Sequence, residues 1–378
     1  MTTDKITLPS PCYLLEASKL RNNLQLIDRV QQASGCTIIL ALKAFAMWSV
    51  FPMVGEYLLG CSASSHNEAR LARQHFGGHV HLYAPAYSAT NFSSLLKLCD
   101  RISFNSLSQW RSFGKQALSA HISCGLRVNP GIDEVETDLY NPCGRESRLG
   151  IPPEEVEDGF PEGIEGLHVH ALCECEADST QRLIDAVENK FGHLLPYLKW
   201  CNLGGGHLMT RPGYDVDRLI IALKRFRQRH PHLEIILEPG SAIAWQAGQL
   251  ISSVLDVIER DGIHIAILDI SATAHMPDVL EMPYRAAVHN ADLPENKPYT
   301  YRLTGPTCLA GDVIGDYAFN QPLNVGDTVI FEDMIHYTMV KTTMFNGVPH
   351  PSIAIQHEDG EIEIVREFNY ADYEMRLS

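Results

Sequence analysis

The sequence has 378 residues, which is long enough for a large hydrophobic core and more than one domain. Apolar residues make up 45% and charged residues 20%, as in an ordinary globular protein, and no apolar run reaches the length of a membrane span. The formal net charge of −16 argues against nucleic acid and membranes as partners and is compatible with a cationic ligand. Because the N-terminal segment does not resemble a signal peptide and the ten cysteines form no disulfide framework, we expect a reduced, cytoplasmic protein.

Short apolar runs alternate with helical patterns over the first two thirds of the chain. The segment 179–198, for example, carries apolar residues at helical spacing. This alternation predicts a parallel α/β fold, and the count of eight strands favours a (β/α)8 TIM-like barrel over an open sheet. The predicted strands are 36–41, 57–62, 79–84, 101–104, 121–128, 165–170, 199–203 and 233–238.

The pattern changes after about residue 245, where strand-like runs are separated by tight turns such as 324–327. These runs are 249–259, 262–271, 299–305, 327–333, 352–358 and 361–367, and residues 6–15 could add another strand. We therefore expect a second domain that is a mostly antiparallel β-barrel or sandwich. The predicted division is a barrel over 29–245 and a β domain formed by 1–28 plus 246–378.

Candidate catalytic groups follow the predicted barrel strands, because the functional sites of such barrels lie at the carboxyl ends of the strands. Lys43 could be a desolvated amine suited to forming a Schiff base, or a surface lysine. Glu238 could hold a pyridinium nitrogen protonated, or could be a simple loop carboxylate. The triplet Gly204, Gly205 and Gly206 could present N–H groups to a phosphate, or could form a plain tight turn.

A competing interpretation starts from the two histidines at the end of the sixth predicted strand. His168 and His170 form an HxH pair, which at the end of a barrel strand can bind a catalytic metal. Further potential ligands near it in the sequence are Cys173, Cys175, His193 and His207. A metal hydrolase on a TIM barrel is therefore an alternative, although no clear ligand spacing completes the set, and the roles of His170 and His207 stay open.

Five motifs in a fixed order resemble the alanine-racemase-like fold of pyridoxal-phosphate enzymes, and within it the ornithine and diaminopimelate decarboxylase group. The motifs are Lys43 after the first strand, Gly166–Val169, Asn202–Gly206, Glu238–Gly240, and Gly305–Cys308 with Asp312. The resemblance spans nearly the whole chain. It implies pyridoxal 5'-phosphate as the cofactor, no catalytic metal, and a homodimer whose active sites are built from both chains.

The resemblance also implies roles for individual residues. Lys43 would hold the cofactor, His168 would stack on its ring, and Glu238 would pair with its ring nitrogen. The glycine triplet would bind the phosphate, helped by Tyr337, while Ser65, Glu68, Arg127 and Gly240 resemble supporting positions. Cys308 and Asp312 resemble residues that reach into the neighbouring subunit's site, with Cys308 as the candidate catalytic acid.

Departures from the group indicate the substrate. Leu309 stands where the ornithine enzymes have an acidic residue, which argues against ornithine. Glu281 stands where the diaminopimelate enzymes have an arginine for a second carboxylate, and Asp278 lies three residues away. This reversed charge suits a cationic amine, with Glu238, Asp278, Glu281 and Asp312 as candidate substrate-binding acids. Ser241 replaces a frequent arginine of the group.

The resemblance, together with these departures, implies decarboxylation of a carboxylated polyamine such as carboxynorspermidine or carboxyspermidine in polyamine biosynthesis. These two substrates differ by one methylene, which the sequence cannot rank. Alternatives are a diaminopimelate or other diamino-acid decarboxylase, the HxH metal hydrolase, and a non-catalytic carrier of the cofactor.

Overall fold

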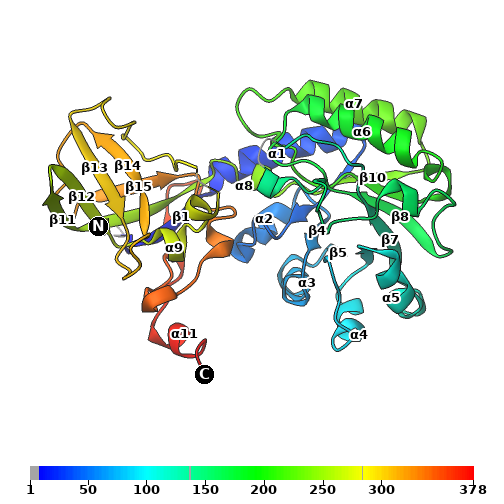
Figure 1. Cartoon of the computed structure of the whole chain (residues 1–378), viewed down its shortest axis with the longest axis horizontal. Coiled ribbons are helices and arrows are strands. Elements are labelled where there is room, and N and C mark those ends of the chain that lie inside the picture. Colours follow the sequence, from blue (N-terminus) through cyan, green and yellow to red (C-terminus); the bar gives the residue numbers. More distant parts are fainter. Residues whose placement is uncertain (1–7, 136–137, 283) are drawn as a thin grey trace. The chain divides into compact units, whose positions relative to one another are not determined.

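The structure, a computed structural model, describes residues 8–135, 138–282 and 284–378, and it divides into two compact units (Figure 1). One unit, called the β unit below, is Met1–Arg21 with Ala244–Ser378, and the other, the barrel unit, is Asn22–Ile243. The expected boundary between residues 28 and 29 falls inside helix α1 (Ala17–Ser34). It stays a prediction that the barrel binds the cofactor and that the β domain completes the active site across a dimer.

The barrel unit contains a closed ring of parallel strands. The strand order is β2-β10-β9-β8-β7-β6-β5-β4-β3, and the first predicted strand is split at Ile39 into β2 and β3, which pair with β10 and β4. The eight predicted strands and the fold class are confirmed. The strands are β2 (Thr37–Ile38), β3 (Leu40–Ala41), β4 (Gly60–Ala63), β5 (His79–Tyr83), β6 (Arg101–Phe104), β7 (Ser123–Val128), β8 (Ile164–Val169), β9 (Trp200–Asn202) and β10 (Glu234–Leu237).

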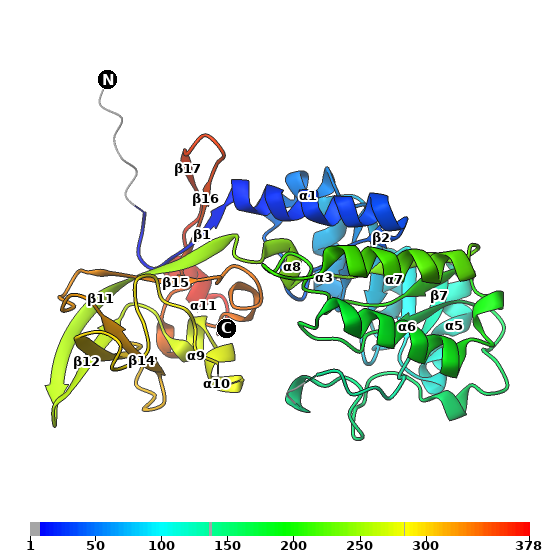
Figure 2. The same cartoon turned by 90° about the horizontal axis from the view of Figure 1, so that it is seen from above.

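Helices connect these strands and surround the ring, as Figure 1 shows. Ser106 and Asp215 cap the amino ends of α5 and α7 by accepting backbone N–H groups, which satisfies donors that a helix leaves free at its start. Helices α6 and α7 pack side by side (Figure 2). The helices are α2 (Phe51–Gly55), α3 (His66–Leu71) continued by a π-turn at Ala72–Phe76, α4 (Phe92–Leu96), α5 (Leu107–Ser119), α6 (Ala177–Phe191), α7 (Val216–Arg229) and α8 (Ser241–Ala244).

Trp200 fills the interior of the ring between β7 and β8. A Cβ atom on Gly166 would lie 2.0 Å from its indole, and one on Gly125 would lie 2.2 Å away, so two bare strand positions make room for this side chain. The indole N–H donates to the Ser123 hydroxyl at 3.0 Å. The ring of His81 packs edge-on against Trp200, with centroids 5.0 Å apart. The barrel is thus a packed core, and polar side chains occupy the layer next to Trp200.

The β unit is built on one large sheet, with order β14-β13-β12-β11-β1-β16-β17 and β15 beside β11. Most pairs are antiparallel, whereas β1·β16 and β12·β13 are parallel. The six strands expected after residue 245 are present, but β14 was missed, and residues 6–7 of the expected N-terminal strand lie outside the described residues. The strands are β1 (Cys12–Glu16), β11 (Gly248–Arg260), β12 (Ile263–Leu268), β13 (Tyr299–Thr304), β14 (Val313–Phe319), β15 (Thr328–Glu332), β16 (Ser352–Gln356) and β17 (Ile362–Arg366).

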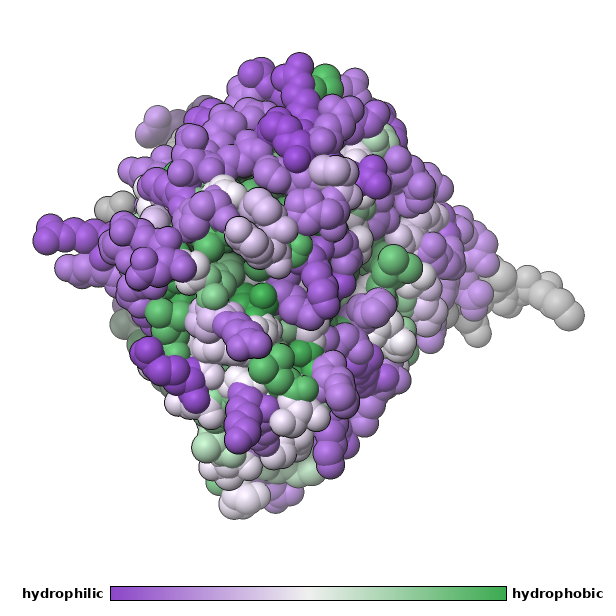
Figure 3. Space-filling model, turned by 90° about the vertical axis from the view of Figure 1, so that its right-hand side faces the viewer, coloured by the Kyte–Doolittle hydropathy of each residue, from purple (hydrophilic) through white to green (hydrophobic). Residues whose placement is uncertain are grey.

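Short helices complete the β unit, namely α9 (Ala272–His275), α10 (Asp278–Glu281) and α11 (Tyr370–Glu374). Within the described ranges, no helix is long and apolar enough to cross a membrane. The face of the molecule drawn in Figure 3 is covered mainly by hydrophilic side chains, with hydrophobic residues gathered toward its centre.

Candidate active site

Lys43 lies on the tight turn that follows β3, at the carboxyl end of a barrel strand. The turn is closed by the Ala44 N–H, which donates to the Ala41 carbonyl at 3.1 Å, and the Ala41 N–H donates to the Pro239 carbonyl at 3.0 Å. A Cβ atom on Gly240 would lie 2.4 Å from the Ala44 side chain, so the two segments approach closely only because Gly240 is bare. The fold therefore places the predicted Lys43 and Gly240 on adjacent turns of one rim.

The Lys43 amine contacts a histidine that fixes its protonation state. Its Nζ lies 3.3 Å from His170 Nε2, while the Gly205 N–H donates to His170 Nδ1 at 2.8 Å. Burial lowers the pKa of His170 well below its ordinary value, so the ring is neutral and carries its proton on Nε2. That proton points at Lys43, which must accept it as a neutral amine. Surrounding protein and the Arg127 charge accordingly lower the pKa of Lys43, although solvent reaches its side chain.

His170 is a site residue to which sequence reasoning gave no role. Strand β8 ends at Val169, so His170 is the first residue beyond its strand, as Glu238 is beyond β10. Alternation along β8 puts His168 and His170 on one face, and this position could have been read from the sequence. The sequence does not reveal that the His170 ring contacts Lys43 and Gly205, because these residues lie on two other loops.

The glycine triplet follows β9 and is needed by the fold itself. Gly204 and Gly206 have φ of +71° and +89°, which side chains rarely adopt. A Cβ atom would lie 2.6 Å from the Val169 carbonyl at Gly204, 2.4 Å from the Glu238 carbonyl at Gly205, and 2.2 Å from the Leu172 carbonyl at Gly206. The triplet thus lets three backbone segments of the rim approach one another.

Two N–H groups of this loop already have protein acceptors. The Gly204 N–H donates to Asn202 Oδ1 at 2.8 Å, and the Gly205 N–H donates to His170, as described above. A phosphate bound by the Gly205 N–H would therefore have to replace His170 as its acceptor.

Glu238 is a buried carboxylate at the first position after β10. Its Oε1 accepts a hydrogen bond from Asn202 Nδ2 at 2.6 Å, and its Oε2 lies 3.9 Å from His168 Nε2. Burial raises the pKa of Glu238, and hydrogen bonds from the Asn202 and Ser62 side chains oppose that rise. Both ring nitrogens of His168 are buried without a hydrogen-bond partner among the described residues. Glu238 and His168 therefore have polar atoms that can still form hydrogen bonds with a ligand.

Arg127 brings a buried positive charge to the same rim. Its guanidinium donates to the His170 carbonyl at 3.0 Å and lies 4.6 Å from the centre of the Tyr83 ring. A carbonyl oxygen and an aromatic face are both suitable partners for a guanidinium cation. This charge disfavours protonation of Lys43 and attracts an anionic ligand.

Ser65 and Glu68 cap the amino end of α3. The Glu68 N–H donates to Ser65 Oγ at 3.1 Å, and the Ser64 N–H donates to Glu68 Oε2 at 2.6 Å. This reciprocal pair fixes the turn after β4. Burial raises the pKa of Glu68, and the hydrogen bond from the Ser64 N–H opposes that rise. Ser65 and Glu68, both predicted as supporting residues, thus form hydrogen bonds within their own turn.

The candidate residues of the β unit are arranged differently. Asp312 is buried, and its carboxylate accepts hydrogen bonds from Thr307 Oγ1 at 2.6 Å and Ser271 Oγ at 3.0 Å. It therefore organises the loop between β13 and β14. Cys308, on that loop, is exposed, and its N–H donates to Asn346 Oδ1 at 2.7 Å. The roles of Asp312 and Cys308 toward a substrate stay predictions.

Asp278 and Glu281 lie at the two ends of α10 and share one counter-ion. Lys341 Nζ donates to Asp278 and, at 2.8 Å, to Glu281 Oε2. The two acids therefore carry a net charge of about −1 with this lysine. Tyr337 lies half-buried in the segment after β15. The substrate role of the acids and the phosphate role of Tyr337 stay predictions.

The remaining histidines of the HxH neighbourhood have structural contacts. His207 is buried, its Nδ1 lies 3.0 Å from the Thr180 hydroxyl on α6, and burial lowers its pKa to about 4. His193 Nε2 faces the Val156 carbonyl at 3.4 Å. Among the described residues, no group of three or more His, Cys, Asp or Glu side chains is placed to hold a metal ion.

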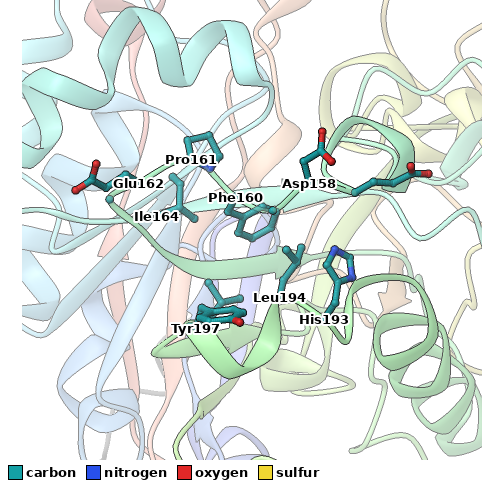
Figure 4. Close-up of a pocket in the computed structure, with 12 residues that line it drawn as sticks. Asp158, Phe160, Pro161, Glu162, Ile164, His193, Leu194 and Tyr197 are labelled. Atoms are coloured by element: carbon teal, nitrogen blue, oxygen red, sulfur yellow. The ribbon is translucent and has the colours of Figure 1, made fainter.

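A groove of about 520 Å³ lies elsewhere on the barrel unit (Figure 4). Its lining includes Asp158, Phe160 and Glu162, which precede β8, and His193 and Tyr197, which precede β9. These residues are at the amino ends of the strands. The groove is therefore distinct from the rim that carries Lys43.

The residues of this rim fit pyridoxal phosphate. A neutral amine on Lys43 suits attack on an aldehyde, and the buried Glu238 carboxylate suits a protonated ring nitrogen. The unpartnered ring nitrogens of His168 and the charge of Arg127 supply further polar contacts for an anionic, heterocyclic group.

The fold and the site define a pyridoxal-phosphate enzyme on an alanine-racemase-like barrel. Residues 13–335 match the family model "Pyridoxal-dependent decarboxylase, C-terminal sheet domain", and the chain belongs to this family. The protein is therefore a decarboxylase, and its cofactor is pyridoxal phosphate, as the sequence predicted. The metal-hydrolase alternative is wrong, because the rim is that of a pyridoxal-dependent decarboxylase.

Three comparisons place the chain within the family. It is 50% identical to carboxyaminopropylagmatine decarboxylase of Synechocystis sp., over 98% of this chain and 96% of that one. A solved structure of carboxynorspermidine decarboxylase from Campylobacter jejuni, complexed with norspermidine, has a TM-score of 0.90 and 42% identity and covers 98% and 100% of the two chains. Diaminopimelate decarboxylase from Helicobacter pylori, at 20% identity, TM-score 0.81 and coverage of 98% and 97%, shares the fold.

Proposed function

We propose that the protein removes the α-carboxylate, as carbon dioxide, from carboxynorspermidine or carboxyspermidine and so forms norspermidine or spermidine. The observation that carries this proposal is the neutral Lys43 amine held beside His170 on the rim that also carries Glu238. Relatives in Campylobacter jejuni and Herminiimonas arsenicoxydans, 43% and 39% identical over 98% of this chain, are carboxynorspermidine/carboxyspermidine decarboxylases. The net charge of −16 suits a polycationic substrate.

Each rim residue has a distinct task in this proposal. Lys43 would hold the cofactor, and its neutral amine would give way to the α-amine of the substrate. Glu238 would keep a proton on the ring nitrogen, the glycine loop and Tyr337 would bind the phosphate, and His168 would contact the ring. The bound cofactor supplies an electron sink for the pair left by the departing carboxylate. Ser65, Arg127 and Gly240 support this arrangement.

Proton return completes the reaction. The α-carbon that has lost carbon dioxide must gain a proton, and Cys308 is our candidate donor because a thiol can be tuned to donate near neutral pH. Its exposure in its own chain suits a residue that serves the partner's site in a cytoplasmic homodimer. Asp312 would hold the loop that presents Cys308, in addition to its expected contact with a substrate amine.

Asp278 and Glu281 would receive the distal amines of the substrate. In the structure Lys341 occupies both carboxylates, so a substrate ammonium would compete with an internal one. Two acids against one lysine leave one negative charge for the ligand. A distal carboxylate, as in diaminopimelate, would instead be repelled.

A second candidate substrate is carboxyaminopropylagmatine. It is favoured by the 50% identity to the Synechocystis enzyme, which exceeds the identity to the carboxynorspermidine enzymes. The two candidates have the same reaction at the α-carbon. They differ in the distal cation, which is a planar guanidinium in carboxyaminopropylagmatine and a compact ammonium in the carboxylated polyamines.

Carbon dioxide release from four substrates tests the proposal. The purified protein is supplied with pyridoxal phosphate and given carboxynorspermidine, carboxyspermidine, carboxyaminopropylagmatine or diaminopimelate. We expect kcat/KM for a carboxylated polyamine to exceed that for diaminopimelate by about 100-fold or more. A preference for diaminopimelate would overturn the proposal, and a preference for the guanidinium substrate would select the second candidate. Lys43→Ala is the inactive control.

A further inference from the structure

A buried chain of hydrogen bonds joins the glycine loop to Glu238 through one side chain. Asn202, the last residue of β9, is fully buried. Its Oδ1 lies 2.8 Å from the Gly204 nitrogen, and its Nδ2 lies 2.6 Å from Glu238 Oε1 and 3.0 Å from His81 Nδ1. The other nitrogen of His81 lies 2.9 Å from the Ser103 hydroxyl. Asn202 therefore touches the expected phosphate loop and the expected partner of the ring nitrogen.

The orientation of the Asn202 amide follows from its neighbours. The Gly204 N–H can only donate, so the amide oxygen must face it. The two amide protons are then directed to Glu238 and to His81, and every bonding group of the amide is used. Because the Glu238 N–H also donates to the Gly204 carbonyl at 2.8 Å, the loop and the carboxylate are joined twice.

His81 must be neutral in this arrangement. Its Nδ1 faces an amide proton and therefore accepts, so its own proton is on Nε2 and is donated to Ser103. A second proton on Nδ1 would oppose the amide N–H. Burial lowers the pKa of His81 to about 3, in agreement with this geometry. Asn202, His81 and Ser103 thus form an uncharged network, and the Asn202 amide of this network donates to Glu238.

Burial disfavours the ionised form of Glu238, and hydrogen bonds from the Asn202 and Ser62 side chains oppose this effect. The titratable and charged groups that face it are His81 on β5 at 3.7 Å, His168 on β8 at 3.9 Å, Lys43 after β3, and Arg127 on β7. Both histidines are neutral, and Lys43 is a neutral amine when it accepts from His170. The neutral side-chain donors to the carboxylate are therefore the Asn202 amide and the Ser62 hydroxyl, and of these two the amide also bonds to the glycine loop.

We propose that Asn202 is a positioning residue of this decarboxylase: it holds Glu238 ionised and fixes the glycine loop at the same time. The proposal rests on the proposed role of Glu238 toward the ring nitrogen of pyridoxal phosphate. It predicts that one side chain couples the phosphate end of the cofactor site to the ring-nitrogen end.

The test measures pyridoxal phosphate affinity of the apoenzyme against pH, by absorbance titration, in pairs of proteins with and without Glu238→Gln. The ratio of the two dissociation constants reports what the ionised carboxylate contributes, and it falls toward one as the pH drops through the pKa of Glu238. Asn202→Leu keeps the volume and removes the donor. We expect it to move the midpoint of this ratio upward by about 1–2 pH units, the value of a hydrogen bond to a charged group.

Asn202→Gln is the conservative control, because it keeps an amide that can accept from Gly204 and donate to Glu238 and His81. We therefore expect its midpoint to stay below that of Asn202→Leu. Asn202→Ala, which leaves space for water, is made in parallel in case the leucine variant does not fold, and circular dichroism identifies the folded variants.

The outcomes separate the inference from the function on which it rests. A leucine or alanine variant that weakens binding equally at every pH, with an unmoved midpoint, has a merely structural defect and overturns the inference. A midpoint in Asn202→Gln as high as that of Asn202→Leu overturns it as well. Failure of the unmodified protein to bind pyridoxal phosphate, or a ratio of one at every pH, instead contradicts the proposed function.

Discussion

The candidate residues of the barrel unit have shifted pKa values or unpartnered ring nitrogens, whereas the candidate acids of the β unit are paired with neighbouring side chains. At the barrel rim, Lys43 has a lowered pKa, the buried Glu238 has a raised one, and His168 keeps two unpartnered ring nitrogens. In the β unit, the Asp312 carboxylate accepts hydrogen bonds from Thr307 and Ser271, and Asp278 and Glu281 share Lys341. Perturbed groups gather where chemistry is done, so the rim is where covalent catalysis is expected. The β unit offers acidic side chains and an exposed thiol, whose roles toward a ligand stay predictions.

The largest expected effect compares one lysine from each unit. Lys43→Ala removes the proposed attachment point of the cofactor, and we expect kcat to fall by about 10²–10⁴-fold or more. Lys341→Ala removes a surface counter-ion and should leave kcat within a few-fold of its original value. Steady-state rates of carbon dioxide release check both. Similar losses in the two variants would remove the distinction between the units.

Glycine substitutions compare the two units in stability. Gly206→Ala forces a Cβ atom to within 2.2 Å of the Leu172 carbonyl at φ +89°, so we expect the free energy of unfolding to drop by about 1–3 kcal/mol. Gly311→Ala in the β unit meets nothing within 4 Å and should change it by less than about 0.5 kcal/mol. Denaturant unfolding of both apoproteins measures the difference, and equal values would show that the loop tolerates side chains.

Stability should also depend on pH through His207. Its pKa is lowered from 6.5 to about 4, so its neutral form stabilises the fold above pH 6.5 and this stability is lost as the pH falls toward 4. At pH 5 the loss from this one group is about 2 kcal/mol. We expect His207→Asn to reduce the difference in unfolding free energy between pH 7 and pH 5 by about that amount, whereas His264→Asn, at an exposed site, should not. If His207→Asn left the pH 7 to pH 5 difference in unfolding free energy unchanged, the lowered pKa of His207 would be contradicted.

The smallest expected effect concerns the acids of α10. Glu281→Gln removes half of the proposed amine cradle from an exposed site, and we expect KM for the polyamine to rise about two- to fivefold with kcat unchanged. Asp278→Asn should act in the same direction. A fall in KM in either variant would show that these acids hinder the substrate instead of binding it.

Much of the architecture was readable from the sequence, and the reasons are local. Apolar runs such as 101–104 and the helical spacing of 179–198 specify strands and a helix almost by themselves. Strand β14 was missed because Gly315 and Asp316 interrupt its apolar pattern. The split of the first strand at Ile39 follows from barrel closure, which no local pattern encodes.

The site was predictable at the level of which residues end a strand, but not of what each one touches. The triplet at residues 204–206 was expected to stay bare for phosphate, whereas the structure shows that carbonyls of Val169, Glu238 and Leu172 also require it. The Asn202 amide was noted only as part of a motif, because its three partners come from other loops and strands. Such long-range contacts depend on tertiary packing that one sequence does not reveal.

The most direct test of the account is to locate the lysine that holds the cofactor. The protein is loaded with pyridoxal phosphate, treated with borohydride to fix the cofactor in place, digested, and mapped by mass spectrometry. We predict a single modified peptide carrying the cofactor on Lys43, and none in Lys43→Ala. Modification of another lysine in the unmodified protein, or none at all, would contradict the account.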